Sequence, residues 1–225
     1  MTRTYFVTGT DTEVGKTAVS CALLRAAAKA GLSTAAVKPV AAGCDEHGHN
    51  EDALQLMECM TAELDYEQVN PVALAPAIAP HIAAAQAGRT LQAARLAGLS
   101  RGVMMTGHDQ VLIEPAGGWR VPQSRRETLA DLARELGVGV ILVVGMRLGC
   151  INHALLTAEA VRRDGLSLAG WVANEPGETM GCYRENLDTL QRLLPAPFLG
   201  EVRRLTPWDA HVASNSFNIE ALAGK

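Results

Sequence analysis

The sequence predicts an α/β fold in which a mostly parallel, twisted β-sheet carries helices on both faces. Two observations support this prediction. Short apolar runs of strand length alternate with longer segments of helical periodicity along the chain. The run at residues 138–144 is almost continuously apolar, as expected of a strand that is covered on both faces. Strands of this kind, separated by helices, pair in parallel through right-handed crossovers.

The elements follow one another in a regular order. An apolar strand at residues 4–8 leads through a glycine-containing loop into a helix at 16–30. Further strands are predicted at 34–40, 110–113, 138–144, 168–173 and 198–202. Further helices are predicted at 52–61, 90–105, 127–136, 151–163 and 181–194, several of them followed by glycine, a common helix stop. The proline- and alanine-rich stretch 70–80 is expected to run irregularly over the surface, and beyond residue 206 the pattern supports only a short terminal helix.

Length and composition favour one globular domain over residues 1–225, because 48% of the residues are hydrophobic and can form a sizeable core. The formal net charge of −4 and the lack of a basic cluster argue against a nucleic-acid partner. The N-terminus does not resemble a signal peptide, and no uncharged apolar run reaches about 18 residues. We therefore expect a cytoplasmic protein that has no membrane partner and acts on small molecules.

The five cysteines are irregularly spaced and form no C-x-x-C pair, which argues against a disulfide framework and agrees with a reducing cytosol. One alternative is a transition-metal site in residues 44–49, which include Cys44, His47 and His49. The potential ligands there lack helical spacing and lie in a polar, glycine-containing stretch.

The loop between the first strand and the first helix has the features of a phosphate-binding loop. Its sequence, Gly-Thr-Asp-Thr-Glu-Val-Gly-Lys-Thr at residues 9–17, places glycines and a helix N-terminus where backbone N–H groups can converge on phosphate oxygens. Lys16 would reach the outer phosphates, and the Thr17 hydroxyl would bind Mg²⁺. Five residues, not the usual four, separate the first glycine from Gly-Lys-Thr. The loop predicts a fold of the P-loop NTPase type and favours ATP without selecting its base; the alternative is a glycine-rich turn with an incidental lysine.

The stretch 6–17 resembles the long phosphate loop of the dethiobiotin synthetase family, which has the same extra residue. Other landmarks of that family follow in its order: Lys-Pro-Val at 38–40, Asn-Glu-Asp-Ala at 50–53, Pro-His at 80–81, Glu114 with Ala-Gly-Gly-Trp at 116–119, Leu-Gly-Cys-Ile-Asn-His-Ala at 148–154, Gly-Trp-Val-Ala-Asn at 170–174 and Leu-Pro-Ala-Pro at 194–197. The resemblance covers roughly residues 1 to 201.

This resemblance implies an ATP-dependent cyclo-ligase of biotin biosynthesis that forms C–N bonds. In the implied reaction, 7,8-diaminopelargonate captures CO₂ as a carbamate, ATP phosphorylates the carbamate, and the second amine closes the ureido ring. The products are dethiobiotin, ADP and phosphate. The resemblance also implies Mg²⁺ as cofactor, ATP as co-substrate and a homodimer.

The resemblance assigns roles to individual residues as well. Catalytic roles are implied for Lys38, Lys16 and Thr12. Magnesium would be bound by Thr17, Asp52 and Glu114. Nucleotide contacts are implied for Glu13, Val14, Gly15, Lys16, Thr17, Ala18, Asp52, Glu114, Pro115, Ala116, Gly117, Asn174 and Glu175, with Asn174 at the adenine edge. Substrate contacts are implied for Thr12, Lys38, Ala42, Ile151 and Asn152, the last two at a helix start that meets the substrate carboxylate across the dimer interface.

The residue types alone leave plainer roles open for four of these positions. Lys38 could be a solvated lysine at a strand end, and Asp52 an acid in the first turn of a helix. Asn152 could be a helix cap, and Asn174 could begin a turn without any contact to a ligand.

Three departures from the family pattern leave room for other functions. Ala42 stands where a small hydroxyl residue is usual, Pro115 replaces a glycine, and residues 202–204 (Val-Arg-Arg) replace an Ile-Pro segment near the base. A diverged P-loop ligase with another substrate or nucleotide is therefore one alternative. A partition-type ATPase switch is a second, although such proteins carry an extra lysine early in the loop and no lysine lies between Gly9 and Gly15 here.

Overall fold

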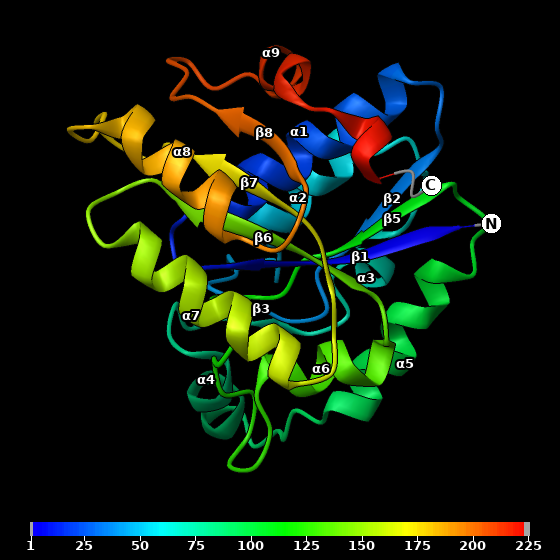
Figure 1. Cartoon of the computed structure of the whole chain (residues 1–225). Helices are drawn as coiled ribbons and strands as arrows, with labels where there is room; N and C mark the ends of the chain where they lie inside the picture. The colour runs from blue at the N-terminus through cyan, green and yellow to red at the C-terminus, as the bar shows by residue number, and fades with distance from the viewer. Residues whose placement is uncertain (1, 223–225) are drawn as a thin grey trace.

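The computed structural model describes residues 2–222 and is built around a six-stranded β-sheet. The strand order is β2-β5-β1-β6-β7-β8, and every pairing within it is parallel (Figure 1). The strands are β1 (Arg3–Gly9), β2 (Thr34–Val37), β5 (Gln110–Ile113), β6 (Gly139–Gly145), β7 (Leu168–Asn174) and β8 (Phe198–Val202). The predicted α/β fold with a parallel sheet is confirmed.

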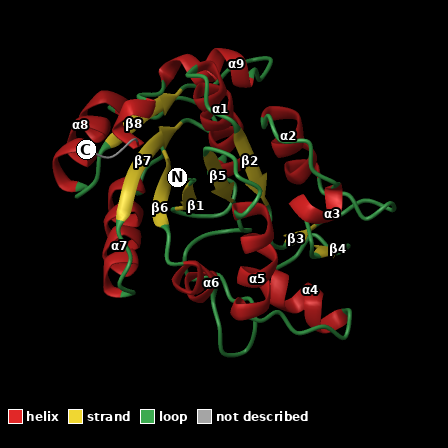
Figure 2. Cartoon of the chain, turned by 90° about the vertical axis from the view of Figure 1, so that its right-hand side faces the viewer, coloured by secondary structure: helices red, strands yellow, loops and turns green. Residues whose placement is uncertain are grey.

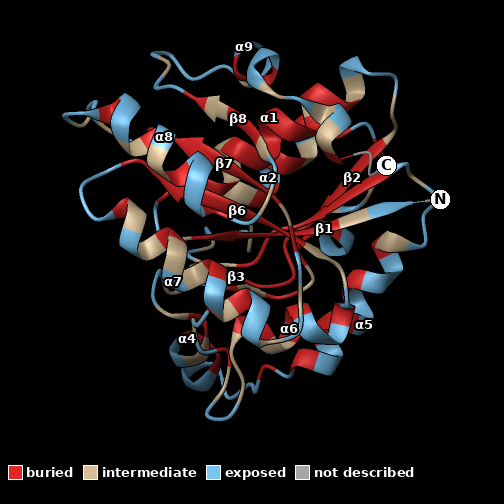
Figure 3. Ribbon diagram, viewed as in Figure 1, coloured by how far each residue is buried: buried red, intermediate tan, exposed pale blue. Residues whose placement is uncertain are grey.

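Helices cover both faces of this sheet. They are α1 (Lys16–Lys29), α2 (Glu51–Cys59), α3 (Tyr66–Val69), α4 (Pro80–Gln86), α5 (Ala93–Met104), α6 (Leu129–Leu136), α7 (Cys150–Arg163), α8 (Tyr183–Leu193) and α9 (Ala210–Ala213). In Figure 1, α1 and α9 lie above the sheet, whereas α5, α6 and α7 lie below it. Because both faces are covered, the central strands β1 and β6 are buried except at their first residues, and Figure 3 shows them among the most buried parts of the chain.

Local sequence explains where several elements begin and end. At the start of α6, Thr128 and Asp131 form a reciprocal capping box, and Gly137 ends the helix with a left-handed φ of 67°. Strand β2 stops at Val37, earlier than predicted, because the next N–H, that of Lys38, donates to Val69 and Pro39 has no N–H. The chain thereby leaves the sheet at Lys38, one of the predicted site residues.

The stretch 70–80 differs from the irregular surface excursion that its composition predicts. Ala73–Leu74 (β4) pairs in parallel with Ala41–Ala42 (β3) in a second, two-stranded sheet (Figure 2), and Val72 and Leu74 are buried. The helix that follows begins at Pro80, whose fixed φ suits the first helical turn. The prediction was wrong because pairing between such short strands leaves no periodic pattern in the sequence.

Three further features bear on the predictions. After residue 206, α9 is followed by 3₁₀ turns at Ser214–Ser216 and Ile219–Leu222, where only one short helix was expected. Across residues 2–222, no helix is both long and apolar enough to cross a membrane. The same residues hold no group of three or more His, Cys, Asp or Glu side chains placed to bind one metal ion, so the alternative metal site at 44–49 has no support.

Candidate active site

The predicted phosphate loop connects the carboxyl end of β1 to the N-terminus of α1. Glu13 and Gly15 both adopt left-handed backbone conformations, with φ of 58° and 81°. Gly15 is the N-cap residue of α1, and no side chain caps the helix, so the first N–H groups of the helix remain available to an anion. A Cβ atom at Gly15 would lie 2.1 Å from Nδ2 of Asn174, so this position requires glycine.

Contacts from the neighbouring strands hold the loop in place. Nδ2 of Asn174, at the end of β7, donates to the Val14 carbonyl at 2.8 Å. The N–H of Gly145 donates to the Thr10 hydroxyl at 3.3 Å. Arg147 forms an ion pair with Asp11. Asn174 therefore has a structural role in the loop, which the sequence did not reveal, in addition to the predicted contact with adenine.

A buried cluster of opposite charges lies beside the loop. Nζ of Lys38 is 2.7 Å from Oδ2 of Asp52 and 3.0 Å from Oε1 of Glu114. The Thr17 hydroxyl donates to the same Glu114 oxygen at 2.7 Å. Lys38 is 3% exposed and Glu114 is fully buried. Lys38 is therefore not the solvated strand-end lysine that its residue type left open, and Asp52 does more than begin a helix.

Burial and neighbouring charges shift the pKa values of Lys38, Asp52 and Lys16. Burial alone would lower the pKa of Lys38, but the carboxylates of Glu114 and Asp52 outweigh burial and raise it. Burial alone would raise the pKa of Asp52, but the charge and hydrogen bond of Lys38 hold it below its usual value. Burial lowers the pKa of Lys16, and the charge of Glu114 offsets this only in part. An anion bound next to Lys16 would stabilise its protonated form.

The oxygen atoms of the cluster suit a hard divalent cation. Thr17, Asp52 and Glu114 bring together one hydroxyl and two carboxylates, the donor type that Mg²⁺ prefers. Oε2 of Glu114 is buried and has no hydrogen-bond partner within residues 2–222. A buried carboxylate oxygen without a partner is costly, and a cation would satisfy it.

A cavity of about 830 Å³ opens in front of the loop and the charged cluster. Most of the predicted site residues line it: Thr12, Glu13, Gly15, Lys16, Thr17, Ala18, Lys38, Ala42, Asp52, Ala116 and Gly117. Val14, Glu114 and Pro115 are buried residues that do not line the cavity, and Asn174 and Glu175 are buried where β7 ends. The far wall, formed by residues 77–80 with Val121 and Pro122, was not predicted. The Pro-His pair at 80–81 was the one sequence signal that pointed to it.

Ile151 and Asn152 lie outside this cavity lining, in the first turn of α7. The N-cap of α7 is Gly149, and no side chain makes a capping hydrogen bond. The exposed Asn152 therefore does not cap the helix, and that alternative is wrong. Leu148, just before the helix, is 92% exposed and Leu156 is 57% exposed.

Glu175 is the centre of a second charged group at the ends of β7 and β8. Its Oε2 lies 3.1 Å from Nε of Arg203 and accepts a hydrogen bond from the N–H of Arg204 at 3.3 Å. The Arg203 guanidinium also lies 4.3 Å from the centre of the Tyr183 ring. The arginines that depart from the family pattern thus pack against a predicted nucleotide-binding residue.

A chain of hydrogen bonds links the two ends of the Lys38–Asp52 ion pair. The Tyr66 hydroxyl accepts from the N–H of Asn50, the N-cap of the helix that carries Asp52, at 2.7 Å. The same hydroxyl donates to Oδ1 of Asn70 at 3.0 Å, and Nδ2 of Asn70 donates to the Lys38 carbonyl at 2.7 Å. Tyr66 thereby fixes both partners of the ion pair relative to each other. Sequence reasoning missed it because it lies in a short helix that carries no motif.

Comparison with known proteins agrees with these features. A family model described as an AAA domain matches residues 3–212. Proteins named ATP-dependent dethiobiotin synthetase BioD are similar to this chain. The protein from Pseudomonas aeruginosa strain UCBPP-PA14 is 58% identical and covers 89% of this chain and 90% of its own length. The protein from Cellvibrio japonicus is 54% identical and covers 98% and 97%, and BioD 1 of Escherichia coli O157:H7 is 48% identical and covers 96% and 95%.

Solved structures share the fold. The septum site-determining protein MinD from Pyrococcus horikoshii, complexed with Mg-ADP, matches with a TM-score of 0.57 and 13% identity over 100% of this chain and 90% of its own. The cell division protein FtsY from Thermotoga maritima matches with a TM-score of 0.57 and 14% identity over 99% of this chain and 67% of its own. At such identity the likeness shows the fold alone.

Proposed function

Since this chain belongs to the ATP-dependent dethiobiotin synthetases, we propose that its cavity binds Mg·ATP at the phosphate loop and 7,8-diaminopelargonate with CO₂ beside Lys38. The enzyme is a ligase of biotin biosynthesis, and the proposal concerns how its residues share the work. The observation that supports it best is the buried Lys38, which faces the same cavity as Lys16 and is held by two carboxylates.

The reaction concentrates negative charge in one place, because the carbamate and the triphosphate are both anions. Two fixed cations, Lys16 and Lys38, line the cavity where these anions must meet. Lys16 binds the outer phosphates, and Lys38 stabilises the carbamate oxygen that receives the phosphoryl group. Thr12 orients the diamine from the loop. The ordered loop and the Lys38 ion pairs keep these groups in place before the substrates bind, so little reorganisation is needed during the reaction.

Magnesium is proposed to be held by Thr17, Asp52 and Glu114, whose oxygens lie together beside the loop. When bound, the ion supplies charge neutralisation to the phosphate groups. The chain's own contribution is to present one hydroxyl and two carboxylates on three different elements: Thr17 on α1, Asp52 on α2 and Glu114 after β5. The partnerless Glu114 oxygen supports this assignment.

The remaining proposals concern the assembly. We propose that residues 1–225 act as one P-loop domain and that the chain forms a homodimer in the cytoplasm. The apolar side chains of Leu148 and Leu156, exposed beside Asn152 near the start of α7, support a partner on that face. Asn152 and Ile151 would then reach the substrate carboxylate of the neighbouring subunit. The mass of the protein in solution tests this directly, and a monomeric mass at the assay concentration would contradict it.

The proposed function is tested by ADP release from the purified protein with Mg·ATP and bicarbonate, measured with and without 7,8-diaminopelargonate. The expected result is diamine-dependent ADP release together with the mass of dethiobiotin. Omission of Mg²⁺ should abolish both signals. ADP release that ignores the diamine would contradict the proposal and support the alternative of a nucleotide switch.

A further inference from the structure

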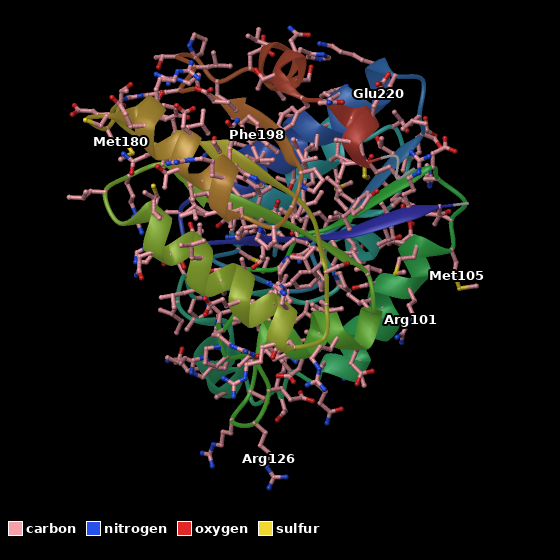
Figure 4. The ribbon with its side chains drawn as sticks, viewed as in Figure 1. Arg101, Met105, Arg126, Met180, Phe198 and Glu220 are labelled. Atoms are coloured by element: carbon pink, nitrogen blue, oxygen red, sulfur yellow. The ribbon has the colours of Figure 1, made fainter. Side chains whose placement is uncertain are left out.

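A second cavity, of about 650 Å³, lies next to the active-site cavity. Two chain segments, residues 79–82 and 121–127, lie between the two cavities. Ala79 and Pro80 with Val121 and Pro122 line the active-site cavity, whereas the residues that follow them, 81–82 and 123–127, line the second one. Helix α4 and the start of α5 complete its wall. Figure 4 marks its outer rim by Arg126, at the tip of the loop below the sheet.

The charge of this cavity is strongly positive. Arg89, Arg125 and Arg126 all line it, and within residues 2–222 none of their guanidinium groups forms an ion pair or a hydrogen bond. The one carboxylate in the lining, that of Glu127, already accepts hydrogen bonds from the N–H of Ala93 at 3.0 Å and from Gln123 at 3.4 Å. Three exposed arginines around one hollow, none of them with an anionic partner in residues 2–222, favour an anionic ligand.

Two buried polar atoms in the lining also lack partners among the described residues. Oε1 of Gln123 and Nδ1 of His81 are shielded from solvent and make no hydrogen bond, and Gln123 is only 1% exposed. Leaving such atoms unsatisfied costs about 1–3 kcal/mol each. Oε1 of Gln123 is an acceptor, so a ligand carrying an N–H donor would satisfy it.

Part of the remaining wall is apolar, beside the polar Thr90, Gln92 and Ser124. Ala84, Leu91 and Ala94 line it together with Ile82, which is 44% exposed. A purely ionic ligand such as phosphate would make no use of this surface, whereas an alkyl chain would cover it. The volume lies within the range of about 300–1,000 Å³ that small-molecule sites occupy.

We propose that this second cavity is a binding site for an aliphatic carboxylate, with the carboxylate at the arginines, the alkyl chain on Ile82 and Leu91, and Gln123 available to an N–H group of the ligand. The proposal does not depend on the catalytic roles assigned above. Two sources share this chemistry: a plain fatty carboxylate, and the enzyme's own product, which carries both a carboxylate and ring N–H groups.

Nonanoate is the first probe, titrated calorimetrically into the full chain with Mg²⁺ and a non-hydrolysable ATP analogue present to occupy the phosphate loop. We expect saturable binding of one nonanoate per chain and no comparable binding of nonylamine, which has the same chain and the opposite charge. In Arg125→Ala/Arg126→Ala, the affinity should fall by roughly tenfold for each arginine that contacts the carboxylate. The rate of dethiobiotin formation should be unchanged in that variant.

The matched control is Arg162→Ala/Arg163→Ala, which removes another adjacent, exposed pair of arginines, at the end of α7. Equal nonanoate affinity in the two double variants, or equal binding of nonylamine, would overturn the proposal. Binding of neither nonanoate nor dethiobiotin would overturn it as well.

Competition identifies the source of the ligand. The site would be assigned to the product if dethiobiotin displaces nonanoate and binds more tightly than nonanoate does. This difference in affinity should be lost in Gln123→Leu. Failure of dethiobiotin to displace nonanoate would assign it to plain fatty carboxylates.

Discussion

Replacing Lys38 with methionine tests the centre of the active site, because the new side chain keeps most of the volume and removes the ammonium group with its charge and hydrogen bonds. The ammonium group lies 2.7 Å and 3.0 Å from two carboxylates. Loss of one preorganised charge from a buried site costs a rate factor of ~10² or more. Removing one partner of a buried ion pair costs roughly 3–5 kcal/mol of stability, and we expect about 3 because the Asp52 side chain is 46% exposed to water. For a chain of this length, that corresponds to a melting temperature lower by roughly 6–12 °C.

The pH dependence of this loss has a definite sign. The pKa of Asp52 is lowered in the folded state, so the ion pair stabilises the protein above the unfolded pKa of about 3.9, and the contribution disappears as the pH falls through the folded pKa below that value. The pKa of Lys38 is raised, so its contribution is complete below about 10.4 and is lost only at higher pH. The difference in melting temperature between wild type and Lys38→Met should therefore be largest near neutral pH and shrink below about pH 4.

Dethiobiotin formation, followed by mass detection, and thermal melts at pH 3 to 8 measure the two effects. Lys29→Met is the matched control, since Lys29 is an exposed lysine at the far end of α1 and should leave the turnover unchanged. A Lys38→Met enzyme that keeps more than about half of the wild-type rate, or a stability deficit that is the same at pH 3 and pH 7, would refute the reasoning.

Three further substitutions test the surrounding residues. Thr17→Val removes the hydroxyl that donates to Glu114 at 2.7 Å, and we expect the Mg²⁺ concentration for half-maximal ADP release to rise by about tenfold or more. The control Thr12→Val leaves the proposed metal ligands in place and should not change that concentration. Gly15→Ala combines a left-handed φ of 81° with a Cβ atom 2.1 Å from Asn174, so ATP binding measured by calorimetry should be lost, whereas binding near the wild-type level would show that the loop is not held as described. Tyr66→Phe breaks the hydrogen-bond chain between the two residues of the Lys38–Asp52 ion pair. We expect kcat to fall several-fold, KM for ATP to stay unchanged and the free energy of unfolding to fall by about 1 kcal/mol. An unchanged kcat would limit Tyr66 to a structural role.

The sequence predicted the central sheet well because its strands are mostly apolar. The strand at 110–113 matches β5, and the strand at 198–202 matches β8, to the residue. Ends of helices were less predictable: the helix expected to begin at residue 90 begins at Ala93, because the backbone of the N-cap residue Gln92 is still extended. The short elements between residues 66 and 86 were missed, because elements of two to seven residues are too short to show a clear period.

In the active site, too, the sequence predicted some residues and missed others. The motifs in the sequence were enough to name Lys16, Thr17, Lys38, Asp52 and Glu114, and the structure brings these residues together beside the phosphate loop. The residues that hold these side chains in position could not be named. Tyr66 and Asn70 act through single hydrogen bonds to atoms distant in the sequence, and such contacts depend on tertiary packing that leaves no local pattern.

Pro115 shows how a departure from the family pattern can be compatible with the site. A proline inside a parallel sheet would remove a ladder hydrogen bond, but β5 ends at Ile113, and the last N–H donated to the neighbouring strand is that of Glu114, to Val37 at 2.9 Å. Pro115 therefore lies at the first position after β5 where the pairing of the sheet requires no backbone N–H donor. Its fixed φ limits the backbone directly after the predicted magnesium ligand, so the replacement should hold Glu114 in place without loss of sheet pairing. Pro115→Gly tests this step: we expect the metal requirement to stay within about twofold of wild type and the melting temperature to fall by a few degrees, because glycine gains more conformational freedom on unfolding.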